Sequence, residues 1–185
     1  EEEGFRLASR QMLRNGRYKP TGRGKPASEY LVRAAQSGEF PRISGPVDAI
    51  NLVSLRHLVP ISLWDLERAA TDRFEVRLGR AEERYLFNAA GQQLELEDLV
   101  CGCGLQGEPG GERSRPMVSP IKDSLATKIQ QDTRSVAVCI YYPLGAGDRA
   151  HLQQIVDEQQ GWLERCGEGV EGEGATLLPN QSLTF

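Results

Sequence analysis

The residue types that could do chemistry are few in this chain: four cysteines and two histidines. Cys101 and Cys103 stand two positions apart, which in a strand places both thiols on one face, where they could share a soft metal ion. A structural zinc site needs four ligands, and the other thiols and both histidines lie far away in the sequence. Burial of both thiols as small hydrophobic side chains is therefore the favoured interpretation, and we expect no metal and no cofactor.

The two histidines, His57 and His151, do not indicate nucleophilic catalysis. Neither lies near a Gly-x-Ser-x-Gly turn or a papain-like cysteine motif. We expect His57 at a helix end, and His151 near the start of the final helix as a solvated surface residue. The glycine-rich segment 16–25, GRYKPTGRGK, lacks the Gly-x-x-x-x-Gly-Lys-Ser/Thr pattern, so a nucleotide-phosphate loop is not expected either.

A cationic segment near the N-terminus is the strongest charge feature. Positions 4–33 hold eight Lys or Arg residues and one Glu, a net charge of +7, although the whole chain carries −4. Such a segment can contact nucleic-acid phosphates or form a solvated face, and both interpretations remain open at this point. The candidates for phosphate contact are Arg10, Arg14, Arg17, Lys19, Arg23 and Lys25.

The length and composition are those of one folded domain. With 185 residues, 39% of them hydrophobic, the chain can bury a sizeable core. We expect a single domain over residues 1–185, with a basic helix and loop over 1–25 and a mobile acidic segment over 166–174. The longest apolar run is far shorter than the roughly 18 residues of a membrane span. Four cysteines without a recognisable secretion signal favour free thiols and a cytoplasmic location.

Helical spacing dominates the first third of the chain. It predicts a short basic helix over 5–15, an exposed loop over 16–25 and a second helix over 27–37, where Pro and Gly stand at the expected ends. The densely apolar segment 47–58 predicts a largely buried helix. A last long amphipathic helix is expected over 148–165.

From Phe74 onward the apolar period changes to two. The short alternating runs FEVRLG, RYLFN, QQLEL and LVCGCG, separated by turns, predict an antiparallel meander. We expect a loop over 104–116, a central strand over 135–142 and a further strand over 175–178. Helices first, then a mostly antiparallel set of strands, then a helix is typical of an α+β domain.

The segment VDAINLVSLRHLVPISLWDL, residues 47–66, resembles the tRNA-editing domain, modules B three and B four, of the phenylalanyl-tRNA synthetase beta subunit. The likeness continues upstream through KPASEYLVRAAQSGEFPRI and downstream to IKDSLATKIQQDTRSVAVCIYYP, and covers roughly residues 15–145. The positions that carry most of it are Asn51, Ser54, Pro60, Asp65 and Thr133. The resemblance implies the α+β fold of that editing domain, in agreement with the pattern of helices and strands.

The resemblance also implies an activity. The family's editing domain hydrolyses the ester that joins a wrong amino acid, usually tyrosine, to the phenylalanine tRNA. Because no motif of a synthetase catalytic core, anticodon module or adenylate site is visible here, the likeness implies a free-standing aminoacyl-tRNA deacylase that acts in trans. Its partner would be the aminoacylated 3′ end of a tRNA, with no DNA and no membrane. The ester is already activated, so an oriented water and hydrogen-bond donors suffice for its hydrolysis.

Two positions depart from the bacterial form of the family. Ser62 stands where bacterial beta subunits carry the histidine of a Pro-x-His motif, and Cys139 stands where they carry the glutamate that recognises a tyrosine hydroxyl. Because the polar lining of a pocket decides which side chain it accepts, these changes leave the identity of the amino acid open. They also motivate an alternative, a non-catalytic module of the same fold that binds tRNA or an amino acid.

The resemblance places nine residues at or beside an amino-acid pocket, and assigns no catalytic residue. Those expected to line the pocket are Asn51, Ser54, Pro60, Ser62 and Cys139, and those expected near its mouth or supporting it are Asp65, Lys122, Asp123 and Thr133. Structural roles remain open for several of them. Asn51 and Asp65 could cap a helix or a turn, and Thr133 could begin a strand. Lys122 and Asp123 could pair with each other in a surface turn.

Overall fold

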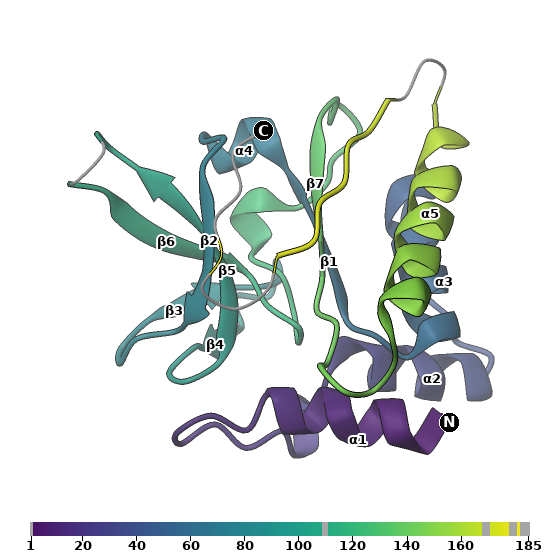
Figure 1. Ribbon diagram of the computed structural model, residues 1–185. Coiled ribbons are helices and arrows are strands. Elements are labelled where there is room, and N and C mark those ends of the chain that lie inside the picture. Colours follow the sequence, from purple (N-terminus) through teal and green to yellow (C-terminus); the bar gives the residue numbers. More distant parts are fainter. Residues whose placement is uncertain (1, 109–110, 168–170, 178–180, 182–185) are drawn as a thin grey trace.

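The fold is α+β, as the sequence predicts. The computed structural model describes residues 2–108, 111–167, 171–177 and 181, and within them the chain forms five α-helices and seven strands. Figure 1 shows a central pair of strands with two helices on one side and a three-stranded sheet on the other. Every helix in this described part is too short or too polar to cross a lipid bilayer. The cytoplasmic location stays a prediction.

The four predicted helices are confirmed, with ends that differ by a few residues. They are α1 (Glu2–Met12), α2 (Ala27–Gln36), α3 (Gly45–His57) and α5 (Arg149–Glu164). A further short helix, α4 (Leu66–Ala69), was not expected. An ion pair between Arg10 and Glu29 joins α1 to α2. Leu58 ends α3 in a left-handed conformation, which turns the chain sharply into the next strand.

The strands form three small antiparallel groups. In the centre, β1 (Ile61–Asp65) pairs with β7 (Val136–Ile140). A three-stranded sheet has the order β2 (Phe74–Leu78), β5 (Val100–Gln106), β6 (Arg113–Val118). A hairpin of β3 (Arg84–Leu86) and β4 (Gln93–Glu95) forms a separate two-stranded sheet. The hairpin and the sheet lie together on the left of Figure 1.

Several strand predictions were wrong. The runs from Phe74 onward do not form a simple meander, because β2 pairs with β5 and the β3–β4 hairpin is inserted between them. The expected loop over 104–116 is largely the β5–β6 hairpin. The strand over 135–142 exists as β7, but it pairs with β1 alone and is not central in a sheet. Residues 175–177 form no strand, and residue 178 lies outside the described residues.

The acidic segment predicted over 166–174 is only partly described. Residues 166–167 and 171–174 are exposed and contain no helix or strand, while 168–170 lie outside the described residues. Its mobility stays a prediction.

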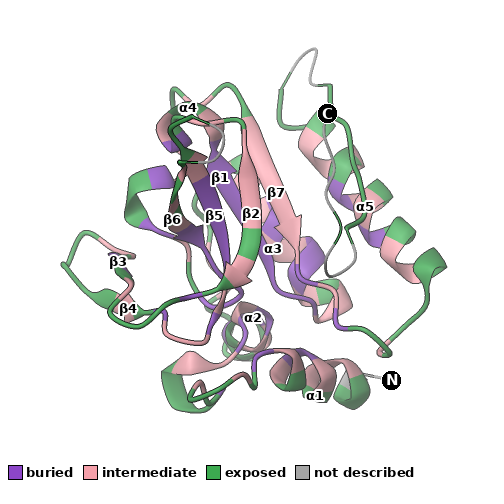
Figure 2. Ribbon diagram, turned by 60° about the vertical axis from the view of Figure 1, so that its left-hand side comes forward, coloured by how far each residue is buried: buried purple, intermediate pink, exposed green. Residues whose placement is uncertain are grey.

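Strand β1 is buried along its whole length and holds the layers together (Figure 2). Ile61 and Leu63 pack with Ile50 of α3 and Ile155 of α5 in one apolar cluster. Successive residues of a strand point to opposite faces, so Ser62 and Trp64 turn away from these helices. Trp64 packs with Met117 and Val118 of β6, in a second apolar cluster. One face of β1 therefore packs in the apolar cluster with α3 and α5, and the other face packs in the cluster with β6.

The two neighbouring cysteines belong to a third cluster and are fully buried. Cys101 and Cys103 of β5 pack with Leu13, Leu96 and Leu99. Burial raises the pKa of Cys101 to about 12 and that of Cys103 to about 11, so both thiols keep their protons at neutral pH. Their interpretation as small hydrophobic side chains is confirmed.

A chain of hydrogen bonds fastens the end of α3 to α5. His57 ends α3, as expected, and its Nε2 lies 2.8 Å from a carboxylate oxygen of Glu158, while its Nδ1 lies 3.0 Å from Nε2 of His151. His151 Nδ1 lies 3.1 Å from the hydroxyl of Tyr142. His151 also makes an edge contact with Phe5 of α1. The expectation of a solvated His151 was wrong, because α1 and the segment after β7 both pack against it.

We expect the packing of α5 with α3 and β1 in one apolar cluster to carry much of the stability. Ile155→Ala should lower the free energy of unfolding by roughly 2–5 kcal/mol, because it leaves a cavity among fully buried side chains. Urea unfolding followed by circular dichroism measures the change. Leu7→Ala on the exposed side of α1 is the matched control and should change the stability by less than about 1 kcal/mol. Equal losses in the two variants would contradict this account of the core.

Candidate functional site

Ser62 is the polar residue of β1 that the strand alternation turns toward β6. Its side chain is 1% exposed, and in the register of β1 and β7 it stands opposite Cys139. A buried hydroxyl needs hydrogen-bond partners, because leaving it without one costs free energy. Those partners come from the segment after β6 and from the residue that follows β7.

Ser62 and Asp123 form the centre of a polar cluster. The hydroxyl of Ser62 donates to Oδ1 of Asp123 at 2.7 Å, and its oxygen lies 3.2 Å from both the Tyr141 hydroxyl and the carbonyl oxygen of Ser119. Asp123 also accepts hydrogen bonds from the backbone amides of Leu63 (3.4 Å) and Ser119 (3.3 Å). Residues 61 positions apart in the sequence are thereby joined, and Asp123 pairs with Ser62, not with Lys122 as the surface-turn alternative required.

Asp123 is a carboxyl group that changes charge near neutral pH. Burial raises its pKa to about 6, although the hydrogen bonds from Ser62 and from the two amides favour the charged form. Burial likewise raises the pKa of Cys139 to about 12, so that thiol is neutral beside it. A half-buried carboxylate with a pKa just below neutral can accept a proton from a water molecule, as a general base does.

Asp65, at the end of β1, is the centre of a second polar group. It is 1% exposed and caps α4 by accepting a hydrogen bond from the amide of Arg68 at 2.9 Å. It also accepts from the Arg68 guanidinium at 2.6 Å and from the Thr133 hydroxyl at 2.5 Å. Burial acts to raise the pKa of Asp65, but these donors outweigh it and lower that pKa. The capping role left open for Asp65 is confirmed, and Thr133 does not begin a strand.

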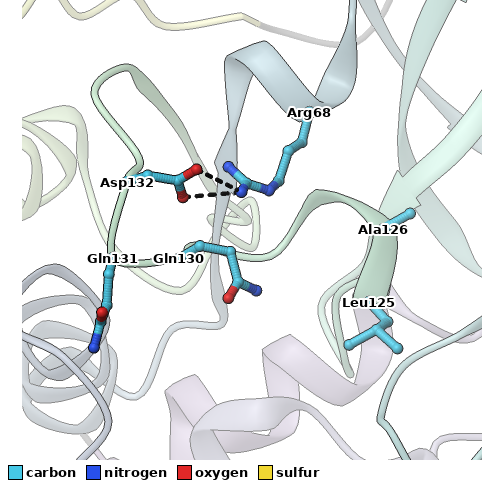
Figure 3. A pocket seen from close by; sticks show the side chains of 6 residues that line it. All are labelled: Arg68, Leu125, Ala126, Gln130, Gln131 and Asp132. Atoms are coloured by element: carbon cyan, nitrogen blue, oxygen red, sulfur yellow. Dashed lines mark hydrogen bonds and ion pairs between the residues drawn. The ribbon is translucent and has the colours of Figure 1, made fainter.

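Beside this second group lies an open depression of about 570 Å³. The Arg68 guanidinium reaches across it to both carboxylate oxygens of Asp132, at 2.9 and 3.1 Å (Figure 3). The remaining lining residues are Leu125, Ala126, Gln130 and Gln131. Leu125 and Ala126 belong to a short 3-10 helix, η2 (Leu125–Thr127), which directly follows Asp123 and Ser124. The segment 123–133 thus runs from the Ser62–Asp123 cluster to the depression.

Residues 19–154 match the model of the B3/4 domain family. The chain belongs to this family. The B3/4 domain is found in the phenylalanyl-tRNA synthetase beta subunit, so the resemblance seen in the sequence is confirmed. Both polar groups and the depression lie within the matched residues. No curated protein matches the chain.

The other predicted pocket residues of this B3/4 domain lie elsewhere. Asn51 and Ser54 belong to α3, which packs on the opposite face of β1 from Ser62. Ser54 is buried and donates to the carbonyl oxygen of Val59 at 2.7 Å, which fixes the turn after the helix. Asn51 makes no side-chain hydrogen bond with any described residue, and Pro60 is fully buried at the start of β1. The structure therefore brings Ser62, Asp123 and Cys139 together and leaves Asn51 and Ser54 outside that group.

The predicted phosphate-binding side chains of the B3/4 domain differ in solvent exposure and in ion pairing. Arg10 is held by Glu29, whereas the side chain of Arg17 is 85% exposed and lies 3.8 Å from Glu97. The amide of Arg17 donates to Asp98 at 2.7 Å. Gly16 has a φ of +46°, and a Cβ there would lie only 2.1 Å from that carboxylate, so glycine is required. Arg14, Lys19 and Arg23 are exposed, and Lys25 is half-buried.

The raised pKa of Asp123 predicts an unusual pH dependence of stability. Between pH 3.8 and about 6 the folded protein holds a proton on Asp123 that the unfolded chain releases, so this group's contribution falls as the pH rises. Over this pH range the contribution of Asp123 to the free energy of unfolding falls by about 3 kcal/mol. We expect the variant Asp123→Asn to lack this pH-dependent fall in stability. Urea unfolding at several pH values between 4 and 8 measures it. The exposed Asp72→Asn should keep the wild-type profile, and an unchanged profile in Asp123→Asn would disprove the assignment.

Asp65 should behave in the opposite way. Its lowered pKa means that its contribution is complete above the unfolded value and is lost as the pH falls through the folded value. We expect Asp65→Asn to cost roughly 1–3 kcal/mol at pH 7, because the amide cannot replace the charge-assisted bonds to Arg68. The difference between variant and wild type should shrink in acid unfolding experiments. A constant difference down to pH 2 would contradict it.

Proposed function

We propose that this chain is an aminoacyl-tRNA deacylase, which hydrolyses the ester of a misacylated tRNA. Membership of the B3/4 family supports the class of activity. The observation that carries the proposal is the Ser62–Asp123 pair, a carboxyl group held by a buried serine and two backbone amides, with a pKa of about 6. Few other groups are needed, because an aminoacyl ester is already activated.

Asp123 acts as the general base in this proposal. Its carboxylate takes a proton from a water molecule as the water oxygen bonds to the ester carbonyl carbon. The bond from that carbon to the ribose oxygen then breaks, and the proton passes to the ribose oxygen, so that an amino acid and a free 3′ hydroxyl result. Ser62 is 1% exposed, so it is a positioning residue that orients Asp123 and not the nucleophile.

The amino acid removed need not be tyrosine. The position of the bacterial glutamate holds Cys139, whose thiol is neutral because burial raises its pKa. A charged acceptor for a tyrosine hydroxyl is therefore missing from that position, although Asp123 and the Tyr141 hydroxyl lie nearby. Discrimination by hydrogen bonding depends on such an acceptor. The substrate panel should accordingly include small and non-protein amino acids.

The N-terminal cations supply the tRNA-binding half of the proposal. Arg14, Arg17, Lys19 and Arg23 are exposed and can each neutralise a backbone phosphate without reading bases. Binding through them should weaken as the salt concentration rises.

One observation favours the alternative, a tRNA-binding module without catalysis. Ser62 and Tyr141 are almost completely covered, so the polar cluster is closed apart from Asp123 itself. A site that must admit an adenosine ester would have to open on this side.

Deacylation of tRNA charged separately with phenylalanine, tyrosine and several small amino acids tests the proposal. We expect one wrong ester to be hydrolysed, with a rate that rises through about pH 6 as Asp123 loses its proton. Asp123→Asn should lower kcat/KM by about 10²- to 10⁴-fold, while Asp72→Asn should not change it. Absence of hydrolysis across the panel, with salt-dependent tRNA binding intact, would establish the binding module instead.

A further inference from the structure

Two lysines of the segment after β6 contact Phe87, and an arginine charge from the N-terminal part of the chain lies near them. The ammonium group of Lys122 lies 4.1 Å from the centre of the Phe87 ring. The ammonium group of Lys128 donates to the carbonyl oxygen of Phe87 at 2.5 Å. Arg23 joins them from η1 (Gly22–Gly24), because its charge is close enough to affect Lys122. Phe87 directly follows β3, so three parts of the chain contribute to this cationic cluster: η1, the end of β3 and the segment after β6.

The cations of this cluster lack direct ion pairs within the described part of the chain, although the charge of Lys128 acts on Asp123. None of its three cations forms an ion pair with a described carboxylate. Burial and then the charges of Arg23 and Lys128 lower the pKa of Lys122. Like charges held together raise the free energy of the folded protein, and a bound anion would reverse that effect.

The cationic cluster borders the candidate site. Lys122 precedes Asp123 in the chain, and its carbonyl oxygen accepts hydrogen bonds from the Tyr85 hydroxyl (2.6 Å) and from Ser119 Oγ (2.9 Å). These bonds fix the backbone that carries both side chains. The charge of Lys128 also acts on Asp123. An anion bound by the cluster would therefore lie next to the Ser62–Asp123 pair.

We propose that Arg23, Lys122 and Lys128 form a binding site for a phosphodiester near the single-stranded 3′ end of an RNA. Surfaces that bind single-stranded nucleic acid combine cations that contact the backbone phosphates with nearby aromatic side chains. The inference rests on the proposed function in one respect, since the phosphate next to the terminal ester is the one that this site would hold. It adds Lys128 and Phe87, which the sequence did not single out, and gives Lys122 a phosphate contact in place of an amino-acid contact.

Binding of a short RNA oligonucleotide ending in CCA, without an amino acid, tests the site. Fluorescence anisotropy over a range of salt concentrations gives the affinity and its salt dependence. We expect Arg23→Gln, Lys122→Gln and Lys128→Gln each to weaken binding several-fold and to reduce the slope of log K against log salt by about 0.7. Arg33→Gln, at an exposed cation of α2, is the matched control and should bind as the wild type does. Unchanged binding in the three variants, or an equal loss in the control, would overturn the proposal.

The protonation of Lys122 gives a second readout that a purely structural role would not change. NMR titration of the lysine side chains should show the pKa of Lys122 rising when the oligonucleotide is bound, and Lys128→Gln should reduce that rise. Inorganic phosphate serves as the comparison ligand. If it binds as tightly as the oligonucleotide, the site takes free phosphate and the RNA assignment is overturned.

The oligonucleotide carries no ester, so its binding does not depend on hydrolysis. If the protein binds the oligonucleotide through these three cations but deacylates no tRNA, the proposed deacylase activity is contradicted and the phosphodiester site is supported. If the protein is an active deacylase and the three variants bind the oligonucleotide normally, only the proposed phosphodiester site is contradicted.

Discussion

The burial of β1 on both faces is the constraint on which the rest of the structure depends. Ile61 and Leu63 complete the apolar contact with α3 and α5, so the alternation of the strand forces Ser62 into the interior on the other side. A serine in that position needs partners, and Asp123 is brought in to supply one. The carboxyl group is then desolvated as well, which raises its pKa. The chemistry of the candidate site is thus a consequence of how one strand packs.

Two carboxyl groups near β1, the buried Asp65 and the half-buried Asp123, show how partners decide the effect of burial on a pKa. Asp65 and Asp123 are both desolvated, yet their pKa values move in opposite directions. Asp65 faces the guanidinium of Arg68, which stabilises its charge, whereas the nearest donors to Asp123 are neutral. Asp65 therefore remains a structural anion, and Asp123 is free to change its protonation state near neutral pH.

The sequence predicted the elements that have local patterns and did not predict contacts between residues far apart in the chain. The four long helices were found because their spacing and end signals are local. The four-residue α4 was missed, and so was β1, because a strand buried on both faces has no simple apolar–polar alternation. Strand β6 was missed because charged residues and a proline interrupt its apolar pattern. Ser62, Asp123 and Cys139 were named through the family resemblance alone, and their contact spans too many residues to be read from spacing. Arg68 and Lys128 carried no signal, since single cations are common on surfaces.

The chain of hydrogen bonds from Tyr142 to Glu158 has a direction. The Glu158 carboxylate can only accept, so His57 must carry its hydrogen on Nε2, and a neutral His57 then accepts on Nδ1 from His151. His151 in turn accepts from the Tyr142 hydroxyl. The tautomer of each histidine is thus set by its neighbours in the chain of bonds, so the joint between α3 and α5 also ties in the segment after β7 that carries Tyr142.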